Sequence, residues 1–72
     1  MIIVQSTFHL VPNARDDAIK HMKHMAQLCV DEAGCLSYEY FQGVTDSNQV
    51  VLLQEWDNAD YLQAHYQTEH ME

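Results

Sequence analysis

The residue best suited by type to do chemistry is a histidine in the last quarter of the chain. His65 lies in a segment whose apolar residues Ala59, Leu62 and Tyr66 share one helical face, and it falls on the flank of that face, inside the buried half of the helix. Because an imidazole changes its charge near neutral pH, His65 is the candidate general base. The alternative is a half-buried histidine that is hydrogen-bonded to a strand carbonyl.

Aromatic side chains in the predicted strands are candidates for an apolar binding site. Trp56 is expected in the core or in the wall of such a site, because large aromatic side chains bury well and also line sites for aromatic ligands. Tyr38 and Tyr40 share a predicted strand face with Leu36, where they either pack in a core or interface or orient a ligand through their hydroxyl groups. Glu55 points to the face opposite Trp56, as an acceptor in a pocket or as a partner in an interface salt bridge.

The sequence does not predict a metal site. His21 and His24, three residues apart, could approach one ion, but two ligands do not close a site, and no Asp or Cys at a suitable spacing completes it. The two cysteines, Cys29 and Cys35, do not form a Cys-x-x-Cys pair and are expected to be reduced packing residues. From these residues we therefore expect no metal site.

Length and charge limit the function classes. Seventy-two residues make one small domain, residues 1–72, which is marginally stable alone, so a homodimer or a higher homo-oligomer is expected. Three basic against eleven acidic residues give a net charge of −8, which disfavours binding to nucleic acid or to an anionic membrane surface. Residues 1–4 have no basic flank and are read as strand, not signal peptide; the default location is cytoplasmic.

The elements that must position these residues follow from the hydrophobic pattern. Residues 2–11 alternate as a strand that ends at Pro12, which cannot donate to a sheet. A helix is expected from an N-cap at Asn13 to about Ala33, with Gly34 as a left-handed C-cap. A hairpin follows, with arms at residues 35–41 and 50–56 and a turn at 45–48, and then a helix from Ala59 to about residue 66, capped by Asn58.

The second hairpin arm is predicted to be the middle of the sheet. Residues 50–53 are apolar on both faces, which is typical of a strand that is covered on two sides. The order strand, helix, strand, strand, helix is five-sixths of a ferredoxin-like β-α-β-β-α-β fold, an α+β class with an antiparallel sheet. Without a last strand, the first strand is an open edge, which either a partner subunit fills or a truncated chain leaves compromised.

Several segments resemble one known family. They are residues 34–39 (Gly-Cys-Leu-Ser-Tyr-Glu), residues 51–56 (Val-Leu-Leu-Gln-Glu-Trp), and His65 and His70 at their spacing from Trp56. Together with the first strand and its helix, they make the whole chain similar to the antibiotic biosynthesis monooxygenase family, apparently without the family's final strand.

The resemblance implies a dimeric α+β barrel in which the sheets of two subunits pack together with the helices outside. It also implies oxidation of a small quinol or hydroxylated aromatic by O₂, with no metal or flavin, because the substrate supplies the electrons. His65 would remove a phenolic proton, and the residues that would contact the aromatic substrate are Trp56, Tyr38, Phe8, Tyr66 and His70. The alternative is a non-catalytic small-ligand-binding or dimeric interaction module of the same fold.

Overall fold

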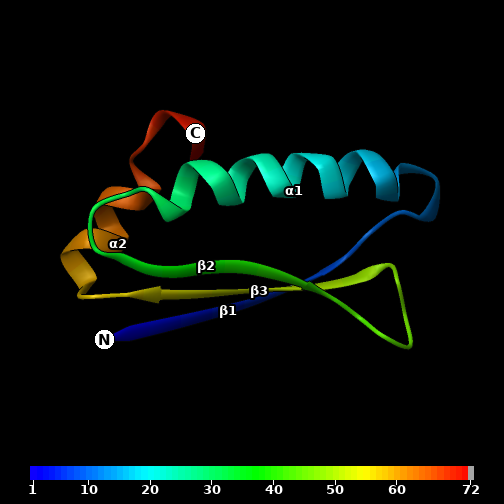
Figure 1. Ribbon diagram of the computed structural model, residues 1–72, viewed down its shortest axis with the longest axis horizontal. Coiled ribbons are helices and arrows are strands. Elements are labelled where there is room, and N and C mark those ends of the chain that lie inside the picture. Colours follow the sequence, from blue (N-terminus) through cyan, green and yellow to red (C-terminus); the bar gives the residue numbers. More distant parts are fainter. Residues whose placement is uncertain (72) are drawn as a thin grey trace.

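The secondary-structure elements follow the predicted order (Figure 1). The structure is a computed structural model, and the described chain comprises residues 1–71, without the side chain of His70. The strands are β1 (Ile2–His9), β2 (Cys35–Gln42) and β3 (Gln49–Trp56), and the helices are α1 (Arg15–Val30) and α2 (Ala59–Tyr66), with 3-10 turns at Pro12–Ala14 and Glu69–Met71. This α+β arrangement confirms the predicted fold class.

The three strands form one antiparallel sheet in the order β1-β3-β2, so β3 is central, as predicted. Ile2 and Cys35 both pair with Trp56 at one end of β3, and Phe8 and Gln42 both pair with Val50 at the other. Along β3 every second residue is buried, because one face of the sheet packs under the helices. Both helices lie on that face in Figure 1.

The core lies between α1 and the central part of the sheet. Its fully or nearly fully buried members are Cys29, Tyr38, Leu52 and Trp56. The apolar stripe of α1 supplies this contact, because Met25, Ala26 and Cys29 fall on consecutive turns of one helix face and pack on the sheet. No helix of the described chain is long and apolar enough to cross a bilayer.

The first helix differs from its predicted bounds at both ends. Pro12 starts a 3-10 turn, so Asn13 lies inside that turn and does not cap α1, whose N-cap residue is Ala14. The helix ends at Val30, three residues earlier than expected. Gly34 nevertheless has the predicted left-handed conformation, with φ +78°, at the last step of the turn into β2.

The second strand begins with an irregularity that the alternating pattern did not predict. A register shift lies between Cys35 and Ser37, and it breaks the expected face shared by Leu36 and Tyr38. As a result, Cys35 packs on the core, while Leu36 is exposed. The cap on α2 is as predicted: the side chain of Asn58 accepts a hydrogen bond from the backbone N–H of Tyr61 (3.1 Å).

The other face of the sheet carries apolar side chains that no described element of the chain covers. Ile3 on β1 and Phe41 on β2 are exposed there, and Val51 and Leu53 of β3 are half-buried between them. Within the described chain, β3 is therefore covered on the helix face and not on the other face, although cover on both faces was expected.

Candidate functional site

A groove of about 310 Å³ runs over the part of the sheet that α1 leaves uncovered. Its floor is built by side chains from all three strands, and its walls come from α1, from the end of α2 and from the chain after α2. The lining residues on the strands are Ser6, Phe8, Tyr38, Tyr40, Leu52 and Gln54. Those on the walls are His21, Met22, Met25, Tyr66 and Met71. The groove is thus mostly apolar and aromatic, with a few polar groups.

Three of the predicted substrate-contacting residues line this groove, namely Phe8, Tyr38 and Tyr66. Tyr40 joins them into an aromatic row, since its ring centroid lies 6.5 Å from that of Phe8 and 5.9 Å from that of Tyr38, the latter pair edge-on. The side chain of His70, also predicted to contact substrate, lies outside the described residues.

His65 and Trp56 lie one layer below the groove. The His65 ring is 0% exposed, and its centroid is 4.8 Å from the Trp56 ring, 5.7 Å from Tyr38 and 5.3 Å from Tyr66. Tyr38 and Tyr66 therefore contact His65 on one side and line the groove on the other. Trp56 is likewise fully buried, and its indole N–H donates to the Gln54 side-chain oxygen (3.0 Å).

A carboxylate that the sequence pattern did not indicate lies beside His65. The Nδ1 atom of His65 lies 2.7 Å from Oε2 of Glu32, whose side chain is 14% exposed. This partner is not the strand carbonyl that the alternative interpretation expected. A carboxylate on Nδ1 favours the tautomer that carries its proton there, and this makes Nε2 the proton-accepting atom.

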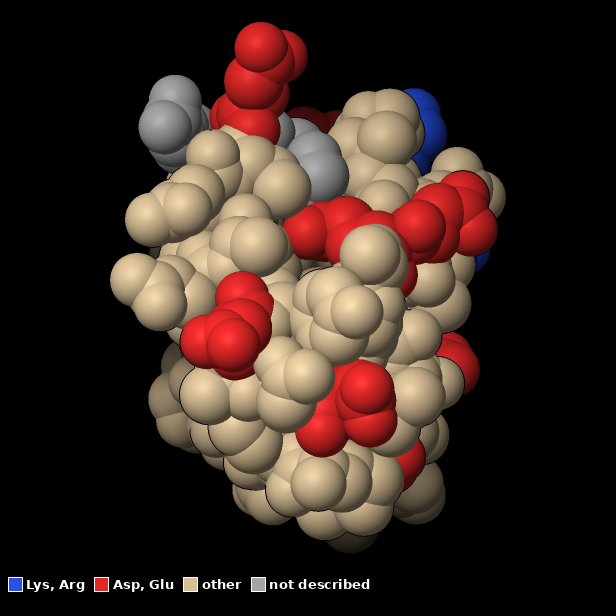
Figure 2. Space-filling model, turned by 90° about the vertical axis from the view of Figure 1, so that its left-hand side faces the viewer, with Lys and Arg blue, Asp and Glu red and all other residues tan. Residues whose placement is uncertain are grey.

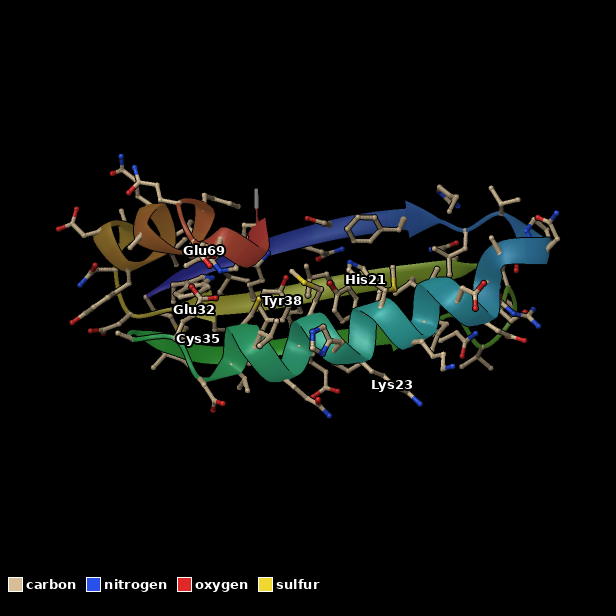
Figure 3. All side chains as sticks on the ribbon, turned by 90° about the horizontal axis from the view of Figure 1, so that it is seen from above. His21, Lys23, Glu32, Cys35, Tyr38 and Glu69 are labelled. Atoms are coloured by element: carbon tan, nitrogen blue, oxygen red, sulfur yellow. The ribbon has the colours of Figure 1, made fainter. Side chains whose placement is uncertain are left out.

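Local structure explains how Glu32 and His65 meet. Glu32 follows the end of α1, and its backbone N–H donates to the Cys29 carbonyl (3.1 Å). The turn then reaches Gly34, whose carbonyl accepts from the N–H of Asp57 (2.9 Å), just before the N-cap of α2. In Figure 3, Glu32, Tyr38 and His21 follow one another along the space between α1 and β1.

A thiol completes this cluster. The ligand atoms of Cys29, Glu32 and His65 all lie within 4.8 Å of one another, and among the described residues these three form a group suited by type to hold a metal ion. This group could not be predicted from ligand spacing, because His65 is more than 30 positions along the chain from Cys29 and Glu32. Burial, with a smaller contribution from the charge of Glu32, raises the pKa of the Cys29 thiol to about 11.

The pKa values of the two groove tyrosines Tyr38 and Tyr40 are also raised. Burial, and then a hydrogen bond with Tyr40, raises the pKa of Tyr38 well above its usual value, and burial raises the pKa of Tyr40. Both hydroxyl groups are therefore protonated at neutral pH and can donate hydrogen bonds. His21 is a further titratable group that we considered only as half of a metal pair; it lines the groove directly.

The charged residues are unevenly distributed. All three basic residues, Arg15, Lys20 and Lys23, line a separate open hollow at the start of α1. The end of the molecule where α2 lies shows several acidic side chains and basic ones only at its margin (Figure 2). The Glu32–His65 pair, which joins the end of α1 to α2, is at this acidic end.

Comparisons with known proteins agree with the fold and place the chain in a family. The model of the family described as antibiotic biosynthesis monooxygenase matches residues 1–72. The Bacillus subtilis protein named "Putative monooxygenase YcnE" is 25% identical over 72 residues, all of this chain and 76% of that protein. Protein sll1783 of Synechocystis is 25% identical over 67 residues, 93% of this chain but only 46% of its own length.

A solved structure of an antibiotic biosynthesis monooxygenase superposes with a TM-score of 0.92 at 27% identity, covering 99% of this chain and 75% of the other. The chain thus belongs to the antibiotic biosynthesis monooxygenase family. This membership supports a general monooxygenase-like function.

Proposed function

We propose that this protein is a cofactor-independent monooxygenase that oxidises a small quinol or hydroxylated aromatic with O₂. In this proposal the substrate binds in the groove and His65, oriented by Glu32, is the general base. The observation that carries it is the His65–Glu32 pair, 2.7 Å apart, packed directly behind two residues that line the groove, Tyr38 and Tyr66. Family membership supports the reaction class.

The groove suits an aromatic substrate of modest size. Its volume of about 310 Å³ is at the lower end of the range for small-molecule sites. Phe8, Tyr38 and Tyr40 offer ring edges and faces to a flat ligand, and Gln54 and Ser6 supply polar groups on the floor. The hydroxyl group of Tyr38 is engaged with Tyr40, which leaves the Tyr40 hydroxyl able to donate to a substrate oxygen.

Proton transfer to His65 requires Tyr66 to move, because the imidazole is fully buried. Tyr66 is 50% exposed and is the last residue of α2, so a change of its side-chain rotamer is expected to open the way from the groove to Nε2. The Glu32 carboxylate then stabilises the imidazolium that forms, as a carboxylate does for the histidine of a hydrolase triad.

Removal of the proton prepares the substrate for O₂. The resulting anion is the electron donor, one oxygen atom enters the substrate, and the other leaves as water. The substrate supplies all the electrons, so the protein's contribution is to bind, orient and deprotonate.

The test is O₂ uptake with a panel of quinols and hydroxylated aromatics. We expect His65→Gln to lower the rate about 10²- to 10⁴-fold, the usual contribution of a positioned general base. His21→Gln is the matched control, because His21 lines the groove without contacting the buried pair. Unchanged rates in His65→Gln, or a loss in His21→Gln alone, would overturn the assignment of the base.

A second candidate is a non-catalytic binding module that holds an aromatic ligand in the same groove. It is favoured by one observation, namely that His65 lies a full layer of side chains below the groove surface. Titration of the quinol panel separates the two: tryptophan-fluorescence or chemical-shift changes without O₂ uptake support the binding module and contradict the enzyme.

We further propose a homodimer in which the outer sheet faces of two subunits pack together. The support is the apolar patch made by Ile3, Phe41, Val51 and Leu53, which no described part of the chain covers. Because the domain is small, covering this patch supplies apolar burial that one chain lacks.

Sedimentation at micromolar concentration tests the dimer. We expect a dimer for the wild type and a monomer for Leu53→Asp, since a carboxylate at the centre of the patch would be buried without a partner. Gln27→Asp places the same charge on an exposed position of α1 and should remain dimeric. A monomeric wild type with a cooperative melt would refute the proposal.

A further inference from the structure

The cluster of Cys29, Glu32 and His65 combines three kinds of metal-binding atom in one buried place. A thiol sulfur, a carboxylate oxygen and an imidazole nitrogen lie within 4.8 Å of one another. Cys29 and Glu32 are three residues apart at the end of α1, and His65 comes from α2. A short-spaced pair plus a remote ligand is an arrangement that zinc sites use.

The distances between the three ligand atoms would suit a tetrahedrally coordinated ion after small side-chain shifts. Ligand-to-metal distances of about 2.0 to 2.3 Å place neighbouring ligand atoms roughly 3.3 to 3.8 Å apart in a tetrahedron. The pair Glu32–His65 stands closer than this, at 2.7 Å, and the widest separation in the cluster does not exceed 4.8 Å. Shifts of about 1 Å would therefore bring all three atoms onto one ion, within the reach of side-chain rotation alone.

The mixture of atom types selects among metals. A thiolate and an imidazole favour Zn²⁺ and similar transition-metal ions over Mg²⁺ or Ca²⁺, which prefer oxygen ligands. Cys29 and His65 are fully buried, whereas Glu32 is 14% exposed, so solvent can reach a bound ion from the side of Glu32. Three protein ligands among the described residues, with a position for an exchangeable ligand, would make a reactive or exchangeable site more than a structural one.

The surrounding charge also favours a cation. Residues 24–72 contain no lysine or arginine, and the charged side chains at the end of the molecule that holds the cluster are acidic, with basic ones only at its margin (Figure 2). The negative electrostatic potential of this surface raises the local concentration of cations and lowers that of anions.

We propose that Cys29, Glu32 and His65 bind a Zn²⁺-class ion, and that the bound ion blocks the proton-accepting function of His65. On binding, the thiol proton of Cys29 leaves to solvent, and the hydrogen bond between Nδ1 of His65 and Glu32 is replaced by metal bonds. The inhibition rests on the proposed function of His65; the binding site does not.

Cobalt titration tests the site, since Co²⁺ is a spectroscopic substitute for Zn²⁺. In the wild type we expect one equivalent to give a near-ultraviolet thiolate-to-cobalt charge-transfer band, which excess Zn²⁺ removes. Cys29→Ser should abolish the band and weaken Zn²⁺ binding by at least 10- to 100-fold, the loss seen when only an outer-shell partner is removed. Cys35→Ser is the matched control, because Cys35 is the other thiol and lies outside the cluster.

Two measurements keep the proposal falsifiable if a variant fails to fold. X-ray absorption on the wild type with one equivalent of Zn²⁺ should show one sulfur at about 2.3 Å and lighter atoms at about 2.0 to 2.2 Å. A first shell without sulfur overturns the site. A His21→Gln/His24→Gln double variant should bind as the wild type does; loss of binding there would assign the ion to the surface of α1.

The activity assay separates the two proposals. Zn²⁺ is expected to inhibit O₂ uptake by the wild type and to have at least 10-fold less effect on Cys29→Ser, which lacks a metal ligand but retains the His65–Glu32 pair. Equal inhibition of both proteins overturns the inhibitory role. A cobalt–thiolate band in a protein without oxidase activity would retain the site and remove the proposed reaction.

Discussion

Gly34 holds the turn that carries Glu32 to His65, and its replacement by alanine is the sharpest structural test of this arrangement. Gly34 has φ +78°, a left-handed conformation that costs a residue with a Cβ roughly 1–2 kcal/mol. A Cβ built at this position also overlaps the Tyr61 side chain, with the Tyr61 Cβ only 2.6 Å away and two ring carbons closer still. The overlapped atoms are next to the backbone, so the tyrosine cannot simply swing aside.

Both effects destabilise the folded state. Overpacking of this kind costs about 1–3 kcal/mol, so Gly34→Ala is expected to lower the free energy of unfolding by about 2–5 kcal/mol in total. For a domain of this size, each kcal/mol corresponds to roughly 4–8 °C in Tm, so Tm should fall by on the order of 10 °C or more. In a Tyr61→Gly background, which removes the Cβ of residue 61 together with the ring, the overlap is gone and only the conformational cost, about 1–2 kcal/mol, should remain.

Urea denaturation of the wild type, both single variants and the double variant measures the coupling between the two positions. We expect a coupling free energy of about 1–3 kcal/mol, with the double variant less destabilised than the sum of the two single variants. An identical cost of Gly34→Ala in both backgrounds would refute the close approach of the turn to α2. No cost in either background would refute the left-handed conformation as well.

The remaining predictions concern burial and capping. Because burial raises the pKa of the Cys29 thiol from 9.0 to about 11, the folded state holds the thiol proton more tightly than the unfolded state. The contribution of Cys29 to the free energy of unfolding should therefore be constant below pH 9 and fall by up to about 2–3 kcal/mol as the pH rises through 11, and Cys29→Ala should flatten this part of the slope in denaturation series at each pH. Trp56→Ala should cost about 3–5 kcal/mol in urea denaturation, because a fully buried ring that packs on His65 is removed. Asn58→Ala should cost about 1 kcal/mol in the same assay, since it removes the acceptor of the Tyr61 N–H; no loss would mean that the cap does not contribute.

The order of elements and the central place of β3 could be predicted because they depend on periodicity. The apolar stripe of α1 repeats over four turns, and residues 50–53 are apolar on both strand faces, patterns with few alternative interpretations. The ends of α1 could not be predicted in the same way. Asn13 and Gly34 have the residue types of caps, but Pro12 starts a separate 3-10 turn, and the chain leaves the helix at Val30.

The bulge at the start of β2 shows a second limit. Strict alternation assigns Leu36 and Tyr38 to one face of the sheet. A single register shift moves every residue before it to the opposite face, and here it separates Leu36 from Tyr38. The aromatic residues after the bulge, the buried Tyr38 and the half-buried Tyr40, were assigned correctly to one face, because the pairing with β3 is regular there.

For the site, sequence reasoning identified the buried histidine and most of the aromatic wall but missed Glu32. Helical periodicity relates residues within one element, whereas the contact of Glu32 with His65 joins two elements 33 positions apart. Glu32 also lies in a turn, where no periodic pattern indicates which way a side chain points. His21 was missed for a different reason: its role as groove lining depends on how much of the sheet α1 leaves uncovered.

The burial of His65 makes it both a packing residue and the proposed base, so its own replacement mixes two effects. His65→Gln would remove the base and also the ring that packs on Trp56. Glu32→Gln separates them, because it keeps the size of the side chain and changes only the charge that stabilises the imidazolium. If the pair acts as proposed, Glu32→Gln should lower the rate of O₂ uptake while leaving the affinity for a groove-bound aromatic unchanged. A loss of affinity with an unchanged rate would instead mean that Glu32 supports the groove and not the proton transfer.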